Sequence, residues 1–219
     1  MSTLRTVDLV RGGDTLLVLL PGAYMQPENF VAAGFLAALE SRQLALDLRI
    51  VALDVATITG SNALLMLQQQ ILDPARADYR HVWLGGISLG GLLALCQAAD
   101  QPQTVDGLCL LAPYPGSRLT ANAIARAGGL AAWEASPEQL ADPEFRAWRW
   151  LKSPPVTLPV FVGHGTEDRF ADGMRRIAER FPVAARCTVP GDHDWPAWQQ
   201  LWEHFLDRFL DHCAAPDKR

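Results

Sequence analysis

Residues 81–99 read HVWLGGISLGGLLALCQAA, and they contain the clearest structural signal in the chain. Its beginning, HVWLGGI, is almost continuously apolar, as expected of a strand covered on both faces, and its end, LLALCQAA, has the composition of a buried helix. Between them stand Ser88 and its neighbours, with glycines at 86, 90 and 91. A strand that turns directly into a helix is the repeating unit of a parallel α/β sheet.

The same alternation recurs along the chain. Five further apolar runs are predicted to be strands: Thr15–Leu20, Leu48–Asp54, Val105–Leu111, Leu158–Gly163 and Ala184–Val189. The predicted helices are Asn29–Arg42, Ser61–Leu72, Leu89–Ala99, Gly173–Arg180 and Trp195–His212. Strands that alternate with helices imply right-handed crossovers, and therefore a three-layer α/β/α sandwich with a mostly parallel sheet. A chain of 219 residues suits a single domain of this kind, residues 1–219.

One stretch interrupts the alternation. Residues 114–155 contain no strand-like run, are broken by several prolines and glycines, and carry three tryptophans and a phenylalanine: Trp133, Trp148, Trp150 and Phe145. Long segments without strands are uncommon inside compact domains unless they are functional. We therefore expect a helical cap or lid inserted between two strands. The alternative is an ordinary crossover whose tryptophans pack on the sheet.

Composition limits the partners. Hydrophobic residues make up 49% of the chain, and 19 Lys and Arg against 24 Asp and Glu give a formal net charge of −5. Nucleic acids and anionic membranes both require a basic patch, so neither is an expected partner. No segment approaches the ~20 apolar residues that span a bilayer, and the run Leu16–Leu20 is too short and too late for a signal peptide. The four cysteines lack the spacing of a metal site. We expect a cytoplasmic protein with no metal.

Ser88 is the candidate nucleophile. It is the central residue of Gly86-Ile87-Ser88-Leu89-Gly90, a GxSxG pattern that lies between a predicted strand and a predicted helix. The backbone must turn so sharply there that any Cβ two residues away would clash, which glycine avoids. The helix that begins after Ser88 would direct its free N–H groups and its positive dipole end at the site. The alternative is a glycine-rich turn with a capping serine.

His193 is the candidate general base, since a serine hydroxyl is a weak nucleophile until a neighbouring base takes its proton. It lies in PGDHDW, after the last predicted strand, and therefore at the carboxyl edge of the sheet together with Ser88. His164 lies at the same edge, and we interpret it as a residue that anchors its loop. The remaining histidines fall at the opposite edge or within the last helix: His81, His204 and His212.

Asp168 is the candidate acid that orients the imidazole and stabilises its charged form. It lies in the loop GHGTEDRF after a predicted strand, and its neighbour Glu167 is expected to point elsewhere if Asp168 points into the site. Asp172 is a fallback with an alternative role as a helix N-cap. Asp192 and Asp194 flank His193, and neighbouring residues rarely orient one another's side chains well.

The loop LLPGAYM, residues 19–25, follows the first strong strand. A tetrahedral intermediate needs N–H donors where its negative charge develops. The backbone N–H of Leu89 is one candidate donor, and that of Ala23, with Tyr24 as the alternative, is the second. Four side chains near strand ends are candidate pocket residues: Tyr24, Met25, Tyr114 and Trp195.

Together these motifs resemble the α/β-hydrolase superfamily, and within it the small carboxylesterase and lysophospholipase-like serine hydrolases. The resemblance spans residues 15–202 and rests on four motifs: LLPGAY, GGISLGG, GTEDRF and GDHDWPAW. It implies the roles of nucleophile, acid and base for Ser88, Asp168 and His193, in the chain order of this superfamily. The sequence departs from the pattern where its oxyanion loop begins with Pro-Gly in place of His-Gly. Its first edge strands are reduced to one candidate, Thr3–Val10.

The reaction implied by the resemblance is acyl transfer through an acyl-serine, with water completing the hydrolysis of a carboxylic ester or thioester. It requires no metal or organic cofactor, and the aromatic residues of 114–155 favour a small-molecule substrate with an apolar acyl or alkyl group. Two other functions stay open. An acyltransferase would use the same three residues with an alcohol or amine in place of water. A non-catalytic binding protein would keep the fold and use 114–155 as an interaction surface.

Overall fold

A computed structural model describes residues 3–53 and 62–210, with the backbone of 211–214. Within these ranges seven strands form one sheet in the order β1-β3-β2-β4-β5-β6-β7. Their bounds are β1 Thr6–Leu9, β2 Thr15–Leu20, β3 Leu46–Val51, β4 His81–Ile87, β5 Gly107–Leu111, β6 Val160–Gly165 and β7 Arg186–Val189. Only the edge strand β1 is antiparallel to its neighbour, and all other pairs are parallel. The predicted mostly parallel sheet is confirmed.

The sheet is covered on both faces, as the hydrophobicity of its strands predicts. Every residue of β2 is buried. Leu16 and Val18 belong to a cluster with residues of the helices on one face, whereas Leu17 and Leu19 belong to a cluster on the other. Because successive side chains of a strand point to opposite faces, one apolar run supplies both halves of the core.

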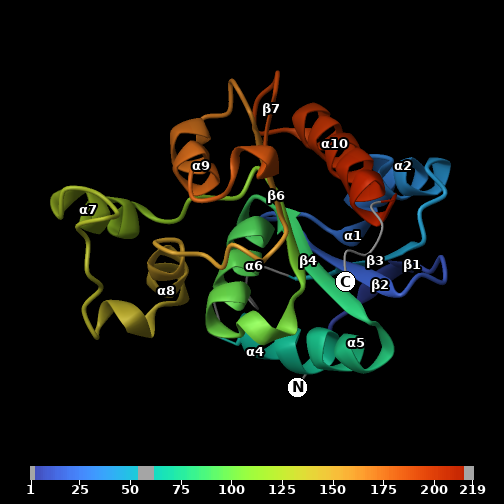
Figure 1. Ribbon diagram of the computed structural model, residues 1–219, viewed down its shortest axis with the longest axis horizontal. Helices are drawn as coiled ribbons and strands as arrows, with labels where there is room; N and C mark the ends of the chain where they lie inside the picture. The colour runs from blue at the N-terminus through green and yellow to red at the C-terminus, as the bar shows by residue number, and fades with distance from the viewer. Residues whose placement is uncertain (1–2, 54–61, 215–219) are drawn as a thin grey trace.

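Helices form the two outer layers (Figure 1). One layer contains α1 Pro27–Ala32, α2 Phe35–Ser41 and α10 Trp195–Ala214. The other contains α4 Ala63–Leu67, the π-helical turn η1 Gln68–Leu72, α5 Asp73–Asp78 and α6 Leu89–Asp100. The helix α9 Ala171–Ala178 follows β6, and short 3-10 turns lie at η2 Pro102–Thr104 and η4 Val183–Ala185. The three-layer α/β/α sandwich is thus confirmed. No helix in the described ranges is both long and apolar enough to cross a membrane.

Two predicted helices differ from the observed ones by more than a shift of one or two residues at their ends. The predicted helix Asn29–Arg42 is two helices, because Gly34 takes a left-handed φ of 80° between them. The helix predicted to end at Leu72 continues to Asp78 through the π-helical turn. Pro74 lacks the N–H that would continue the α-helical ladder, which gives a physical reason for the wider turn.

Several predicted ends fall outside the described residues. These are Asp54 and Ser61, together with the side chain of His212; the side chain of Cys213, the fourth cysteine, lies outside them as well.

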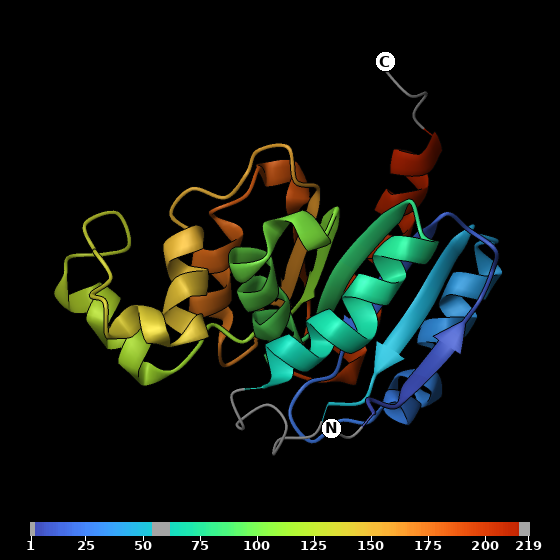
Figure 2. The same ribbon diagram turned by 90° about the horizontal axis from the view of Figure 1, so that it is seen from below.

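Residues 114–155, which we call the insertion, connect β5 to β6. They contain α7 Arg118–Arg126, the 3-10 turn η3 Gln139–Ala141 and α8 Pro143–Trp150, and Figures 1 and 2 both place α7 at the end of the molecule far from β1. Trp133, Phe145 and Trp148 are buried in the core cluster that also contains residues of α6. A bidentate ion pair from Arg146 to Asp100 fixes α8 to the end of α6, at 2.6 and 2.7 Å. These three aromatic residues therefore pack on the core.

Candidate active site

Ser88 occupies a strained turn between β4 and α6. Its φ of 52° and ψ of −114° fit neither a strand nor a helix, and a non-glycine residue with positive φ is uncommon. The flanking glycines are required by close packing. A Cβ on Gly90 would lie 2.2 Å from the carbonyl oxygen of Leu20, and one on Gly86 would lie 2.6 Å from the same oxygen. The GxSxG spacing is therefore explained by the contact between this turn and the end of β2.

Hydrogen bonds fix the backbone of Ser88 to the next strand. Its N–H donates to the carbonyl of Leu111 at 3.1 Å, and its own carbonyl accepts from the N–H of Tyr114 at 2.8 Å. These bonds hold the turn against the end of β5 and the start of the insertion. The Ser88 hydroxyl consequently has a fixed position at the carboxyl edge of the sheet.

His193 joins Ser88 to Asp168. Its Nε2 lies 2.9 Å from the Oγ of Ser88, and its Nδ1 lies 2.6 Å from Oδ2 of Asp168. The Asp168 side chain is fully buried, and that of His193 is 12% exposed. The other carboxylate oxygen of Asp168 accepts the N–H of Phe170 at 2.8 Å. The structure thus brings together the three residues singled out in the sequence, although 105 positions separate His193 from Ser88.

The loops that carry Asp168 and His193 are tied to one another. Thr166 donates its N–H to the carbonyl of Val189 at 2.8 Å, and Glu167 donates its N–H to the carbonyl of Gly191 at 3.0 Å. The Glu167 carboxylate in turn accepts the N–H of Gly191, a bond that lowers the pKa of this carboxyl group. Glu167 therefore points away from the imidazole and holds the His193 loop against the loop of Asp168.

The other carboxylates near His193 have different partners. Asp192 accepts the backbone N–H of His193 at 2.7 Å. Asp194 lies at the start of α10, where its side chain accepts the N–H of Ala197 at 3.4 Å. Asp172 forms an ion pair with Arg175 at 2.7 Å. None of the three contacts a ring nitrogen of His193 among the hydrogen bonds of the described residues.

His164 lies in β6 and is 7% exposed. Its Nδ1 has no hydrogen-bond partner within the described part of the chain. Burial lowers the pKa of this histidine, although the charge of Asp168 acts in the opposite direction. His164 is therefore held in its neutral form beside the Asp168 loop, and it does not line the cavity that contains Ser88.

The backbone N–H groups of the candidate oxyanion donors Leu89 and Ala23 have no acceptor among the described residues, and the same is true of the alternative, Tyr24. Leu89 is the first residue of α6, where helical N–H groups have no intrahelical partner. The loop that carries Ala23 is closed by Met25, which donates its N–H to the carbonyl of Gly22 at 3.2 Å and accepts the Gly22 N–H at its sulfur at 3.3 Å. Tyr24 takes a left-handed φ of 62° in this turn.

A cavity of about 340 Å³ opens above Ser88 and His193, and we call it the Ser88 cavity. Its other lining residues are Ala23, Tyr24, Met25, Leu89, Tyr114, Arg169, Phe170 and Trp198. Three of the four predicted pocket residues line it. The fourth, Trp195, lies outside it and packs edge-on against Phe30 and Trp198, at ring-centroid distances of 5.5 and 5.2 Å.

The prediction from sequence missed three of these lining residues. Phe170 and Trp198 meet the imidazole of His193 edge-on, at centroid distances of 5.3 and 5.2 Å, and so restrict the tilt of the ring. The guanidinium of Arg169 lies over the Phe170 ring at 4.7 Å. Phe170 and Arg169 are sequence neighbours of Asp168, which is the signal that would have identified them. Trp198 lies one helical turn after Trp195, and the pattern alone could not choose between the two.

Within the part of the chain that the structure describes, no group of three His, Cys, Asp or Glu side chains is placed to hold a metal ion. The described cysteines Cys96, Cys109 and Cys187 are buried and free. Burial raises the pKa of all three thiols, so they are protonated and unreactive at neutral pH. The chemistry that this site offers is that of a hydroxyl, an imidazole and a buried carboxylate in a row.

Known proteins share the fold of this chain. Among solved structures, Est1E from Butyrivibrio proteoclasticus superposes with a TM-score of 0.62 and 18% identity over 93% of this chain and 90% of its own. FphF, a fluorophosphonate-binding serine hydrolase of Staphylococcus aureus, gives 0.65 at 12% identity over 95% and 99%. The mouse alpha/beta hydrolase domain-containing protein 10 gives 0.61 at 18% over 96% and 95%. At these identities the likeness establishes the fold alone.

A sequence search of the curated proteins finds no match. The model of the alpha/beta hydrolase family, in contrast, matches residues 17–217, which include all four motifs and most of the chain. The protein therefore belongs to the alpha/beta hydrolase family.

Proposed function

We propose that the protein is a serine hydrolase that cleaves a carboxylic ester or thioester through an acyl-serine intermediate. The observation that carries the proposal is the continuous row from the Ser88 hydroxyl through His193 to the buried Asp168, with contacts of 2.9 and 2.6 Å. Such contacts are within the range in which a base can take a proton from its nucleophile.

Each of the three residues has a distinct role. The Oγ of Ser88 attacks the carbonyl carbon while His193 Nε2 takes its proton, and the same nitrogen returns the proton to the leaving group. Water then attacks the acyl-serine with His193 again as base. Asp168 accepts from Nδ1 of His193, which fixes the tautomer that leaves Nε2 free to act as the base, and it stabilises the imidazolium.

The N–H groups of Leu89 and Ala23 serve as the oxyanion hole. Both belong to residues that line the Ser88 cavity, and neither has an acceptor among the described residues. Because a helix N-terminus carries partial positive charge, the start of α6 adds to the stabilisation of the developing anion. The hydrogen bonds of Met25 to Gly22 hold the Ala23 loop in place before substrate arrives.

The Ser88 cavity favours a substrate with an apolar acyl group of modest size. Its volume of about 340 Å³ lies at the small end of ligand sites, and most of its lining side chains are aromatic or aliphatic. Solved structures with this fold include a ferulic acid esterase, a monoacylglycerol lipase and S-formylglutathione hydrolases. Their names denote the cleavage of ester or thioester bonds. We also propose a cytoplasmic location, since buried free thiols are typical of reducing compartments.

The first experiment is labelling with a fluorophosphonate probe, which phosphonylates an activated serine. We expect one labelled peptide, the one that contains Ser88, and no labelling of Ser88→Ala. A matched control is Ser41→Ala, because Ser41 is an exposed helix residue whose hydroxyl bonds to the carbonyl of Ala38. A panel of p-nitrophenyl esters of increasing acyl length then measures how kcat/KM depends on the length of the chain.

The outcomes separate the three functions. Labelling with turnover of the short esters supports hydrolysis. Labelling with product formed only when an alcohol or amine is added would indicate an acyltransferase. A folded protein that is neither labelled nor active would contradict the proposal and favour a non-catalytic role.

A further inference from the structure

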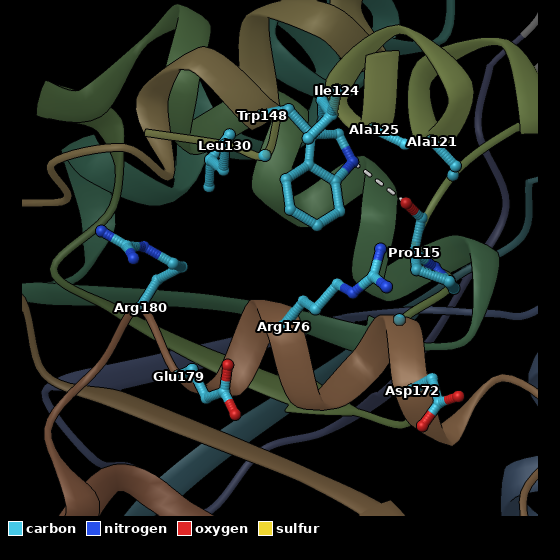
Figure 3. Close-up of a pocket in the computed structure, with 13 residues that line it drawn as sticks. Pro115, Ala121, Ile124, Ala125, Leu130, Trp148, Asp172, Arg176, Glu179 and Arg180 are labelled. Carbon is cyan, nitrogen blue, oxygen red and sulfur yellow. Dashed lines mark hydrogen bonds between the residues drawn. The ribbon is translucent and has the colours of Figure 1, made fainter. Parts of the chain in front are cut away.

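A second and larger cavity lies between the insertion and α9 (Figure 3). Its volume is about 480 Å³, within the range of small-molecule sites. We call it the insertion hollow. It shares no lining residue with the Ser88 cavity. Tyr114 lines the Ser88 cavity, whereas the next residue, Pro115, lines the hollow, so the chain at this point forms the wall between the two.

The walls of the hollow are held by specific contacts. Trp148 donates its indole N–H to the carbonyl of Pro115 at 3.0 Å, which joins α8 to the start of the insertion. Arg180 donates to the carbonyls of Leu151 and Lys152, at 2.8 and 3.0 Å, which joins α8 to the end of α9. At the opposite end of α9, a Cβ on Gly173 would lie 2.5 Å from Pro115. Contacts near both ends of α9 therefore join the two sides of the hollow, so its walls are held by the protein itself.

The two sides of the hollow differ in character. The insertion side is apolar and presents Ile124, Leu130 and Trp148. From the α9 side, Arg176 extends toward Trp148 and Pro115 (Figure 3). Apolar surface opposite a single directed cation is the arrangement expected for an amphipathic anion.

Arg176 differs from the charged residues around it on α9. No hydrogen bond or ion pair joins its guanidinium to any residue that the structure describes. In contrast, Arg175 pairs with Asp172, and Arg180 donates from Nε and Nη2 to the carbonyls of Leu151 and Lys152. The carboxylates of Asp172 and Glu179, which also border the hollow, are directed away from the indole in Figure 3. Arg176 is thus the cation available to a ligand.

We infer that the insertion hollow binds an amphipathic carboxylate, with its apolar body against Ile124, Leu130 and Trp148 and its carboxylate on Arg176. A guanidinium offers paired N–H donors that match the two oxygens of a carboxylate, which neutral molecules of the same shape lack. The site is separate from Ser88, and the inference does not depend on the proposed hydrolysis. Acids released by ester cleavage belong to the same chemical class.

Isothermal titration calorimetry of the full chain tests the inference, with octanoate as the probe and octanamide as its neutral counterpart. We expect saturable binding of octanoate, and about tenfold weaker binding of octanamide. Arg176→Gln should weaken octanoate binding to the level of octanamide. The matched control is Arg175→Gln, which removes the same charge from the adjacent, already paired residue and should leave the Kd of octanoate within about twofold.

A second variant tests the location without removing the cation. Ala125 lines the hollow and is exposed, so Ala125→Phe places a ring in the hollow and should abolish octanoate binding while the protein stays folded. Equal binding by wild type, Arg176→Gln and Ala125→Phe would overturn the inference, as would the absence of octanoate binding. Blocking Ser88 with a fluorophosphonate should leave the Kd of octanoate unchanged. Loss of binding on blocking would assign octanoate to the Ser88 cavity and overturn the separate site.

Discussion

The Ser88 cavity and the insertion hollow are built in opposite ways. At the bottom of the Ser88 cavity the polar groups partner one another, so that Ser88, His193 and Asp168 are fixed before a substrate arrives. In the hollow the Trp148 indole and the Pro115 carbonyl are partnered, but Arg176 has no partner among the described residues. The two cavities thus differ in where unsatisfied groups remain. In the Ser88 cavity they are backbone N–H groups, which we propose as oxyanion donors, and in the hollow they belong to a single charged side chain.

The largest expected effect is that of Ser88→Ala. Removing the nucleophile should lower kcat by at least about 10⁴-fold, since only the oxyanion hole and binding would remain. The melting temperature should change little, because the Ser88 side chain packs at a cavity surface and Ala tolerates the turn about as well as Ser. Octanoate binding in the hollow should also persist, which makes this variant a direct separation of the two regions. Ester hydrolysis at the wild-type rate would remove Ser88 from the mechanism.

The next effect is that of Asp168→Asn, which we expect to lower kcat by about 10³- to 10⁴-fold. An amide can donate to Nδ1 and thereby favour the tautomer whose Nε2 carries the proton, so that His193 no longer acts as a base. Asp192→Asn is the matched control, because among the described residues Asp192 bonds to the backbone N–H of His193 and to no ring nitrogen. Steady-state kinetics with one p-nitrophenyl ester compare the two variants. A larger loss from Asp192→Asn would show that the wrong carboxylate had been assigned.

The two regions also differ in how far the sequence predicts them. The turn at Ser88 could be predicted because it requires glycine on both sides, and this requirement is visible in the sequence at Gly86 and Gly90. His193 and Asp168 follow separate strands, and parallel strands end at one edge of the sheet, so the topology brings them together. The strands β2 and β4 were predicted with their observed bounds for a related reason, since burial on both faces leaves a continuous apolar run.

The insertion hollow could not be predicted in this way. It forms where α8 and α9 approach each other around Pro115, and nothing local to Arg176 distinguishes it from Arg175 or Arg180. The same holds for Trp195 and Trp198, which lie one turn apart on α10. Helical periodicity indicates that both side chains point partly toward the core. Because Phe30 packs against Trp195, it is Trp198 that borders the Ser88 cavity, and this contact is not visible in the sequence. Side chains that depend on tertiary contact are therefore the ones that the sequence missed.

A smaller effect is expected for Arg169→Gln. The guanidinium lies over Phe170 at the Ser88 cavity and has no acceptor among the described residues. It should therefore favour an ester that carries a negative charge at the end of its acyl chain. We expect the variant to lower kcat/KM for mono-p-nitrophenyl glutarate about two- to fivefold, and to leave p-nitrophenyl pentanoate unchanged. Arg176→Gln should affect neither ester. If Arg176→Gln lowered kcat/KM for both esters, the insertion hollow and the Ser88 cavity would not be independent.

The smallest effect concerns His164 and the dependence of stability on pH. Burial lowers the pKa of His164 in the folded protein, with the charge of Asp168 opposing the shift and that of Arg175 adding to it. Below the ordinary histidine pKa of about 6.5 the unfolded chain therefore binds a proton that the folded protein does not. Stability should consequently fall as the pH is lowered through this value toward the folded pKa, and it should be fully present above it.

His164→Asn isolates this contribution, because asparagine keeps a polar side chain of similar width but does not titrate. Melting temperatures of both proteins would be measured from about pH 7.5 to about pH 5. The decrease on acidification should be smaller in the variant than in the wild type, whatever the difference between them at neutral pH. Parallel curves would mean that His164 is protonated as readily in the folded protein as in the unfolded chain. Its unpaired Nδ1 beside the Asp168 loop would then have to be accessible to water when the protein is folded.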